Sequence, residues 1–117
     1  MSRSRPPLAF ALVLASAAVA ACGQDLPTVD CATPAVPTYA MVNAFTLSCT
    51  TCHSSTLTGA SRFGAPRDVN FDTFAAARPH AEEAARRVYA GDMPRAGTLS
   101  AGDAQVLYRW ALCGTPP

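Results

Sequence analysis

The chain has 117 residues, half of them apolar, and its nine arginines and eight acidic residues leave a formal charge of +1 at pH 7. This length is enough for one small domain. A charge so close to neutral excludes a polybasic nucleic-acid binder, which would need a positive footprint for phosphates. The large apolar fraction excludes a disordered acidic tail.

Residues 1–21 predict an export signal. Arg3 and Arg5 precede the uncharged run Leu8–Ala20. A helix of that length is about 20 Å long, too short for a hydrocarbon core of about 30 Å. A basic start, a short apolar stretch and small residues before a break are typical of a secretory signal peptide.

The break after this signal reads Val19-Ala20-Ala21-Cys22 and resembles the lipobox of bacterial lipoproteins. The resemblance implies that Cys22 becomes the first mature residue and carries a lipid. Ordinary cleavage near Ala21, leaving Cys22 a plain thiol, is the alternative. We expect a lipid-anchored protein of the bacterial cell envelope that faces the periplasm. Gly23 stands where Asp marks inner-membrane retention in some bacteria, so the outer membrane is favoured.

Residues 22–37 predict a tether, because they carry three prolines and no helical periodicity. The predicted domain covers residues 38–117. Its first helix is expected between Thr38, as the capping residue, and Cys49, with apolar side chains at helical spacing. These apolar residues are Tyr39, Met41, Val42 and Phe45.

The segment Cys49-Thr50-Thr51-Cys52-His53 is a C-x-x-C-H motif, which is typical of c-type haem attachment. On a helical turn, residues i, i+3 and i+4 lie on one face. Two thiols can then reach the two vinyl groups of a haem while the imidazole of His53 lies beneath the iron. The motif therefore predicts haem c, with its iron, as the cofactor.

Two other interpretations of the motif lack their usual context. A structural zinc site needs four ligands, and a second C-x-x-C or a histidine pair is missing. A thioredoxin-like dithiol needs strands on both sides of the motif, and no alternating pattern flanks it.

After the motif, residues 54–71 hold Gly59, Gly64 and Pro66 and predict a wrapping loop. Asp72 is expected to cap a short turn that ends at residue 77. Pro79 then opens a helix over residues 80–90, with acidic residues early and arginines late, in the order that suits the helix dipole. Gly91 is expected to end this helix.

A Met in the irregular segment 92–99 lies outside any helical packing pattern. Met93 is followed by Pro94, which restricts where the chain can place the thioether. A thioether is a soft ligand that suits haem iron. A flexible gap filler is the other use of such a residue.

The last helix is predicted over residues 100–113. Ser100 and Asp103 form a capping-box pattern, apolar residues follow at helical spacing, and Gly114 closes the helix. Its apolar face, with Trp110, is expected to pack against the first helix and Phe45 as core.

Cys31 and Cys113 remain once lipid and haem have taken the other three cysteines. An oxidising compartment permits a disulfide between them, and two separate free thiols are the alternative.

The C-x-x-C-H motif, the 40-residue gap to Met93-Pro94, the pattern Leu99-Ser100-x-x-Asp103 and the pattern Leu107-x-x-Trp110 together resemble a small class I cytochrome c, over residues 38–114. The resemblance implies an all-α fold, a small bundle of three to four helices with long loops around one haem. It also implies His53 and Met93 as the two axial iron ligands. The family uses a Gly-Pro whose carbonyl orients the histidine. Here Ala65 is inserted between Gly64 and Pro66, and the resemblance implies this role for the carbonyl of Pro66.

His80 is the rival to Met93 for the distal position, and water, Met41 or a vacant site are further alternatives. The resulting prediction is an electron-transfer protein, not an enzyme, with redox proteins as partners. A haem-based ligand sensor with an open distal site and a haem-free, disulfide-stabilised surface lipoprotein are the alternative functions.

Overall fold

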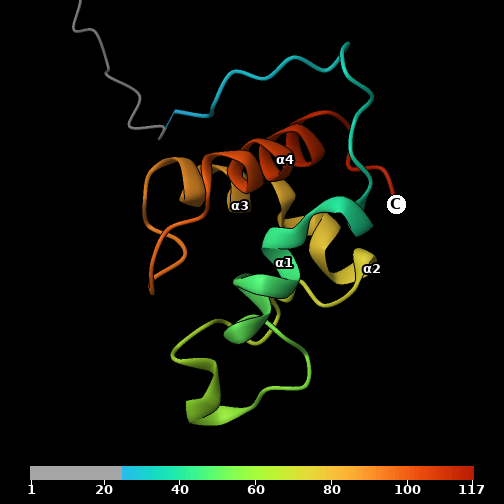
Figure 1. Ribbon diagram of the computed structural model, residues 1–117. Helices are drawn as coiled ribbons and strands as arrows, with labels where there is room; N and C mark the ends of the chain where they lie inside the picture. Colours follow the sequence, from blue (N-terminus) through green and yellow to red (C-terminus); the bar gives the residue numbers. More distant parts are fainter. Residues whose placement is uncertain (1–24) are drawn as a thin grey trace, which may run out of the picture.

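The computed structural model describes residues 25–117, and within this range the protein is helical and has no β-strand (Figure 1). The predicted all-α class is therefore confirmed. The signal peptide and Cys22 lie outside the described residues. The main helices are α1 (Asn43–Leu47), α2 (Phe74–Ala77), α3 (Ala81–Tyr89) and α4 (Ala101–Leu112), and the short 3-10 helices are η1 (Tyr39–Met41), η2 (Cys49–Thr51), η3 (Gly59–Arg62) and η4 (Arg78–His80). No helix in this range is long and apolar enough to cross a membrane.

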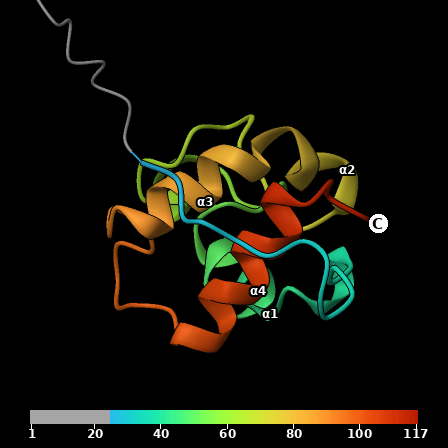
Figure 2. The ribbon, with the colours of Figure 1, turned by 90° about the horizontal axis from the view of Figure 1, so that it is seen from above.

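The core lies where α1, α3 and α4 meet, and aromatic rings dominate it. Trp110 and Phe45 are fully buried and pack edge to face, with 5.2 Å between ring centroids. Phe45 also stacks on Phe71 at 5.2 Å. The predicted contact between the first and last helices is confirmed, although α4 packs against α3 as well (Figures 1 and 2).

The first predicted helix is broken in the structure. Residues 39–51 form η1, α1 and η2 in succession, because the backbone leaves the helical region at Val42 and again at Ser48. Thr38 accepts no capping hydrogen bond, so its predicted cap is wrong. Val42 and Phe45 are both buried in the core, while Met41 is left on the surface.

The ends of α3 and α4 follow the predicted signals. The main-chain N–H of Asp103 donates to the Ser100 hydroxyl at 3.0 Å, which satisfies one free donor of the first turn of α4. Gly91 follows α3 with a φ of +80°, a conformation that favours glycine.

Replacing Ser100 with alanine should lower the free energy of unfolding by about 1 kcal/mol, because the first turn of α4 loses its side-chain acceptor. Urea unfolding of the two proteins measures this difference. Ser100→Asp keeps an acceptor at the cap and should restore most of the loss. Equal stability of the alanine variant and the natural chain would show that the cap contributes nothing.

The cap predicted at Asp72 is also wrong. The Thr73 hydroxyl accepts from the main-chain N–H of Ala76 at 3.2 Å and is the cap of α2. The carboxylate of Asp72 instead accepts from the main chain of Ser55 at 3.0 Å and from the hydroxyls of Ser54 and Ser55. Asp72 therefore closes the base of the loop over residues 54–71.

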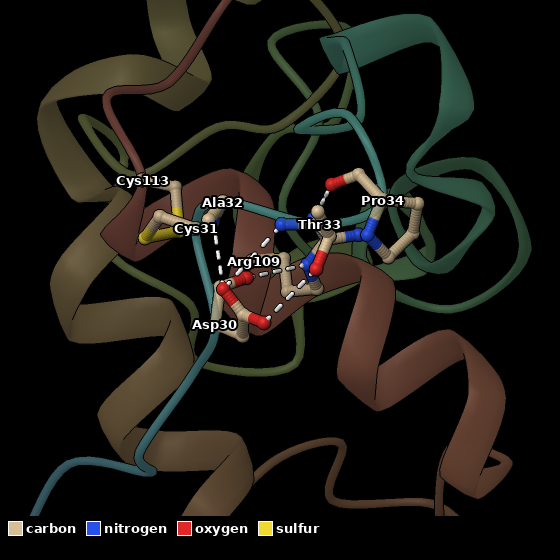
Figure 3. The surroundings of a disulfide bond; sticks show 7 residues. All are labelled: Asp30, Cys31, Ala32, Thr33, Pro34, Arg109 and Cys113. Atoms are coloured by element: carbon tan, nitrogen blue, oxygen red, sulfur yellow. Dashed lines mark hydrogen bonds between the residues drawn. A yellow bond between two sulfur atoms is a disulfide. The ribbon is translucent and has the colours of Figure 1, made fainter.

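A disulfide joins Cys31 to Cys113, as the cysteine count predicts, with 5.5 Å between the two Cα atoms (Figure 3). Beside it the guanidinium of Arg109 donates to the main-chain carbonyls of Asp30, at 3.0 Å, and Pro34. The disulfide and these two contacts thus hold residues 30–34 beside α4 (Figures 2 and 3). Within the predicted tether over residues 22–37, the disulfide and the carbonyl contacts attach this part to the domain.

Candidate cofactor-binding site

One cavity of about 890 Å³ gathers the residues that the sequence predicts for the cofactor. This volume is near the upper end of the range for small-molecule and cofactor sites, about 300–1,000 Å³. The walls come from the C-x-x-C-H turn, the 54–71 loop, α3, α4 and the 92–99 loop. The predicted residues on these walls are Cys49, Cys52, His53, Pro66 and Met93.

The C-x-x-C-H segment forms one tight turn. The main-chain N–H groups of Cys52 and His53 both donate to the carbonyl of Cys49, at 3.2 and 2.8 Å. The turn brings both cysteines and the histidine to the same cavity wall, as the i, i+3, i+4 argument predicts. Both thiols are free, and burial raises the pKa of the Cys49 thiol to about 11, so this thiol is protonated at neutral pH.

A main-chain carbonyl and an aromatic ring hold the imidazole of His53 in place. Its Nδ1 lies 3.1 Å from the main-chain carbonyl of Val69, so the proton is assigned to Nδ1 and the lone pair to Nε2. Phe71 packs edge to face on the ring at 5.5 Å between centroids. Burial lowers the pKa of His53, which favours the neutral ring, the form that ligates a metal.

The role that the family resemblance implies for Pro66 belongs to Val69. The carbonyl of Pro66 accepts from Arg62 at 2.5 Å instead of from His53. Pro66 remains on the cavity wall but does not orient the histidine. This difference is consistent with the insertion of Ala65 between Gly64 and Pro66. The sequence could not predict the role of Val69, because the acceptor is a main-chain carbonyl and does not depend on the side chain.

Met93 is half-buried and lines the same cavity as His53. Its main-chain N–H donates to the carbonyl of Arg87 at 3.2 Å, directly after the turn that ends α3. The end of α3 therefore fixes where the 92–99 loop starts. A thioether and an imidazole on the wall of one cavity are a ligand set that suits haem iron.

His80 also lines the cavity, but its ring is hydrogen-bonded to the loop that holds His53. Its Nε2 lies 2.9 Å from the carbonyl of Asp68, the residue before Val69. Phe71 packs near both histidine rings, at 5.5 Å from His53 and 6.5 Å from His80. His80 is thus bound to the same loop as His53, which argues against it as a second ligand opposite His53. Met41 is 61 % exposed and is not part of the cavity wall.

Two large apolar side chains that the sequence analysis did not single out line the cavity from exposed positions. Leu47 and Phe63 are 72 % and 69 % exposed. Phe63 also has a φ of +50°, which is unusual for a bulky residue and costs backbone energy. An exposed aromatic residue held in this way at a cavity is well placed to cover an apolar group.

The donor set and the lining fit a haem group. Two free thiols at the correct spacing, an imidazole with its Nδ1 fixed and a thioether share a large, mainly apolar cavity. Across residues 25–117, no group of three or more His, Cys, Asp or Glu side chains is close enough to hold a metal ion. Comparisons with models of protein families, with curated proteins and with solved structures found no match.

The loop that carries Val69 should lose stability in acid. Hydrogen bonds from Ser55 hold the pKa of Asp72 below its ordinary value of 3.8. The unfolded chain thus takes up this proton at a higher pH than the folded chain, so the stabilisation is complete above pH 3.8 and is lost as the pH falls through the lower, folded value. We expect Asp72→Asn to flatten this acid dependence. Thermal unfolding of both proteins from about pH 5 to about pH 2.5 measures it, and parallel curves would contradict the role of Asp72.

Proposed function

We propose that this protein is a covalent c-type haem electron carrier that is lipid-anchored at Cys22 to the bacterial cell envelope and faces the periplasm. The observation that supports this proposal most strongly is the shared cavity of the C-x-x-C-H turn and Met93. The proposal places the chain among small class I cytochromes c, and its partners are redox proteins. In this proposal the protein transfers electrons and is not an enzyme.

In this proposal each residue of the site has a distinct task. The thiols of Cys49 and Cys52 would attach the porphyrin, and Nε2 of His53 and the thioether of Met93 would bind its iron. The bound haem supplies a one-electron couple at iron. The hydrogen bond from His53 to Val69 sets the ring orientation and the basicity of Nε2.

The apolar residues of the cavity have the task of excluding water. Leu99 and Leu107 line it from the 92–99 loop and from α4, and Phe63 lines it from the 54–71 loop. A dry, low-dielectric surrounding and a Met/His ligand pair both raise a haem reduction potential. With both His53 and Met93 bound to it, the iron would have no free position for a small substrate.

Visible spectra of the full-length protein, purified from a bacterium that attaches haem c, test this proposal. We expect low-spin spectra in both redox states and no change when CO is added to the reduced protein. A high-spin spectrum with CO binding would favour the ligand sensor with an open distal site. A colourless protein that does not stain for haem after denaturing electrophoresis would favour the haem-free surface lipoprotein.

A further inference from the structure

Arg62, at the end of η3, is a buried cation that no carboxylate accompanies. Its side chain is 3 % exposed. Among the ion pairs of residues 25–117 none involves Arg62. A buried charge is costly unless polar groups surround it.

Main-chain carbonyls surround this guanidinium instead. Nε donates to Ala65 at 3.2 Å, and the two terminal nitrogens donate to four more carbonyls of the same loop. These four are Ser54 at 2.5 Å, Leu57 at 3.5 Å, Pro66 at 2.5 Å and Val69 at 3.0 Å. Every N–H of the guanidinium can thus be used, and only the planar fork of arginine supplies five donors.

One of these acceptors is the carbonyl that holds the proximal histidine. The oxygen of Val69 accepts from Arg62 at 3.0 Å and lies 3.1 Å from Nδ1 of His53. A carbonyl oxygen has two lone pairs, so it serves both donors at once. Arg62 therefore fixes the position of the group that fixes the imidazole.

We propose that Arg62 is a positioning residue that sets the orientation and the donor strength of His53 through the Val69 carbonyl. This inference rests on the proposed function. By drawing electron density from the shared oxygen, the cation weakens the hydrogen bond from Nδ1 and makes Nε2 a weaker donor to iron. The buried positive charge also disfavours the oxidised iron. Both effects raise the reduction potential.

The midpoint potential of three haem-loaded variants tests the proposal. Arg62→Met should shift the redox equilibrium about tenfold toward the oxidised state, which corresponds to 59 mV for one electron. Arg62→Lys keeps the charge but has only three donors, and it should still shift the equilibrium at least about threefold. Arg109→Met is the matched control, because the guanidinium of Arg109 also donates to main-chain carbonyls, those of Asp30 and Pro34, but does not line the cavity. It should shift the equilibrium less than about twofold.

The outcomes separate positioning from charge. An unchanged potential in Arg62→Lys would overturn the positioning role and leave Arg62 as a charge alone, and this variant decides the matter if Arg62→Met does not fold. A control that shifts as far as Arg62→Met would also overturn it.

If the natural chain carries no covalent haem, the proposed function fails. The hydrogen-exchange rate of the Phe71 amide then tests the positioning role of Arg62 without haem. The N–H of Phe71 donates to the His53 carbonyl at 2.9 Å. Exchange that is at least about tenfold faster in Arg62→Lys supports the positioning role, and unchanged exchange overturns it.

Discussion

Replacing Met93 with alanine is expected to lower the midpoint potential of the haem-loaded protein and to open its iron to CO. In the proposed function the Met93 thioether binds the iron and favours its reduced state, so its loss should shift the redox equilibrium at least tenfold toward the oxidised state, or about 59 mV. The residue lies on the cavity wall with His53, and the main chain of Arg87 fixes its loop. Spectroelectrochemistry and CO titration of the reduced protein measure the two effects.

His80→Ala and Met41→Ala are the controls for this prediction. His80 is hydrogen-bonded to the loop that holds His53, and Met41 is exposed away from the cavity. Both variants should keep the low-spin spectrum and the resistance to CO. An unchanged spectrum in Met93→Ala, together with a high-spin spectrum in His80→Ala, would identify His80 and not Met93 as the distal ligand.

Removing the disulfide between Cys31 and Cys113 should lower the free energy of unfolding substantially. The bridge joins residues 82 positions apart. Loop-closure entropy over this distance contributes about 4.5 kcal/mol, which is a large fraction of the stability of a small domain. The variant Cys31→Ser with Cys113→Ser should lose about this free energy of unfolding in urea titrations.

Arg109→Met is the matched control, because it leaves the bridge in place and removes the contacts of Arg109 with the carbonyls of Asp30 and Pro34. It should cost less than about 1.5 kcal/mol, since these contacts are exposed. A double serine variant as stable as the control would contradict the structural role of the bridge. Two additional thiol adducts in the natural protein, measured without reductant, would contradict the bridge itself.

The features that the sequence predicts correctly are those that depend on local signals. The polar cap at Ser100, the glycine after α3 and the apolar spacing of α4 each act within a few residues. The spacing of the C-x-x-C-H motif is also local, and the structure forms the expected turn. The exception is the pairing of Cys31 with Cys113, which is not local and follows from the number of cysteines that remain after the other three are assigned.

The errors occur where a contact far along the chain decides the outcome. Asp is a residue type that commonly caps helices. The carboxylate of Asp72 is instead bound by Ser55, which is distant in the sequence, and Thr73 caps α2. The orienting group for His53 is a main-chain carbonyl at Val69, and any residue type carries such a carbonyl. The burial of Arg62 depends on five carbonyls that meet only after the 54–71 loop has folded.

The measurement that tests the central claim most directly is the intact mass of the denatured mature protein, exported from a bacterium that attaches haem c. We predict that the natural chain carries the added mass of one haem, which denaturation does not remove. The variant Cys49→Ser with Cys52→Ser should lack this mass and keep the disulfide. A natural chain without the added mass, or a double variant that retains it, would contradict covalent haem attachment at this site.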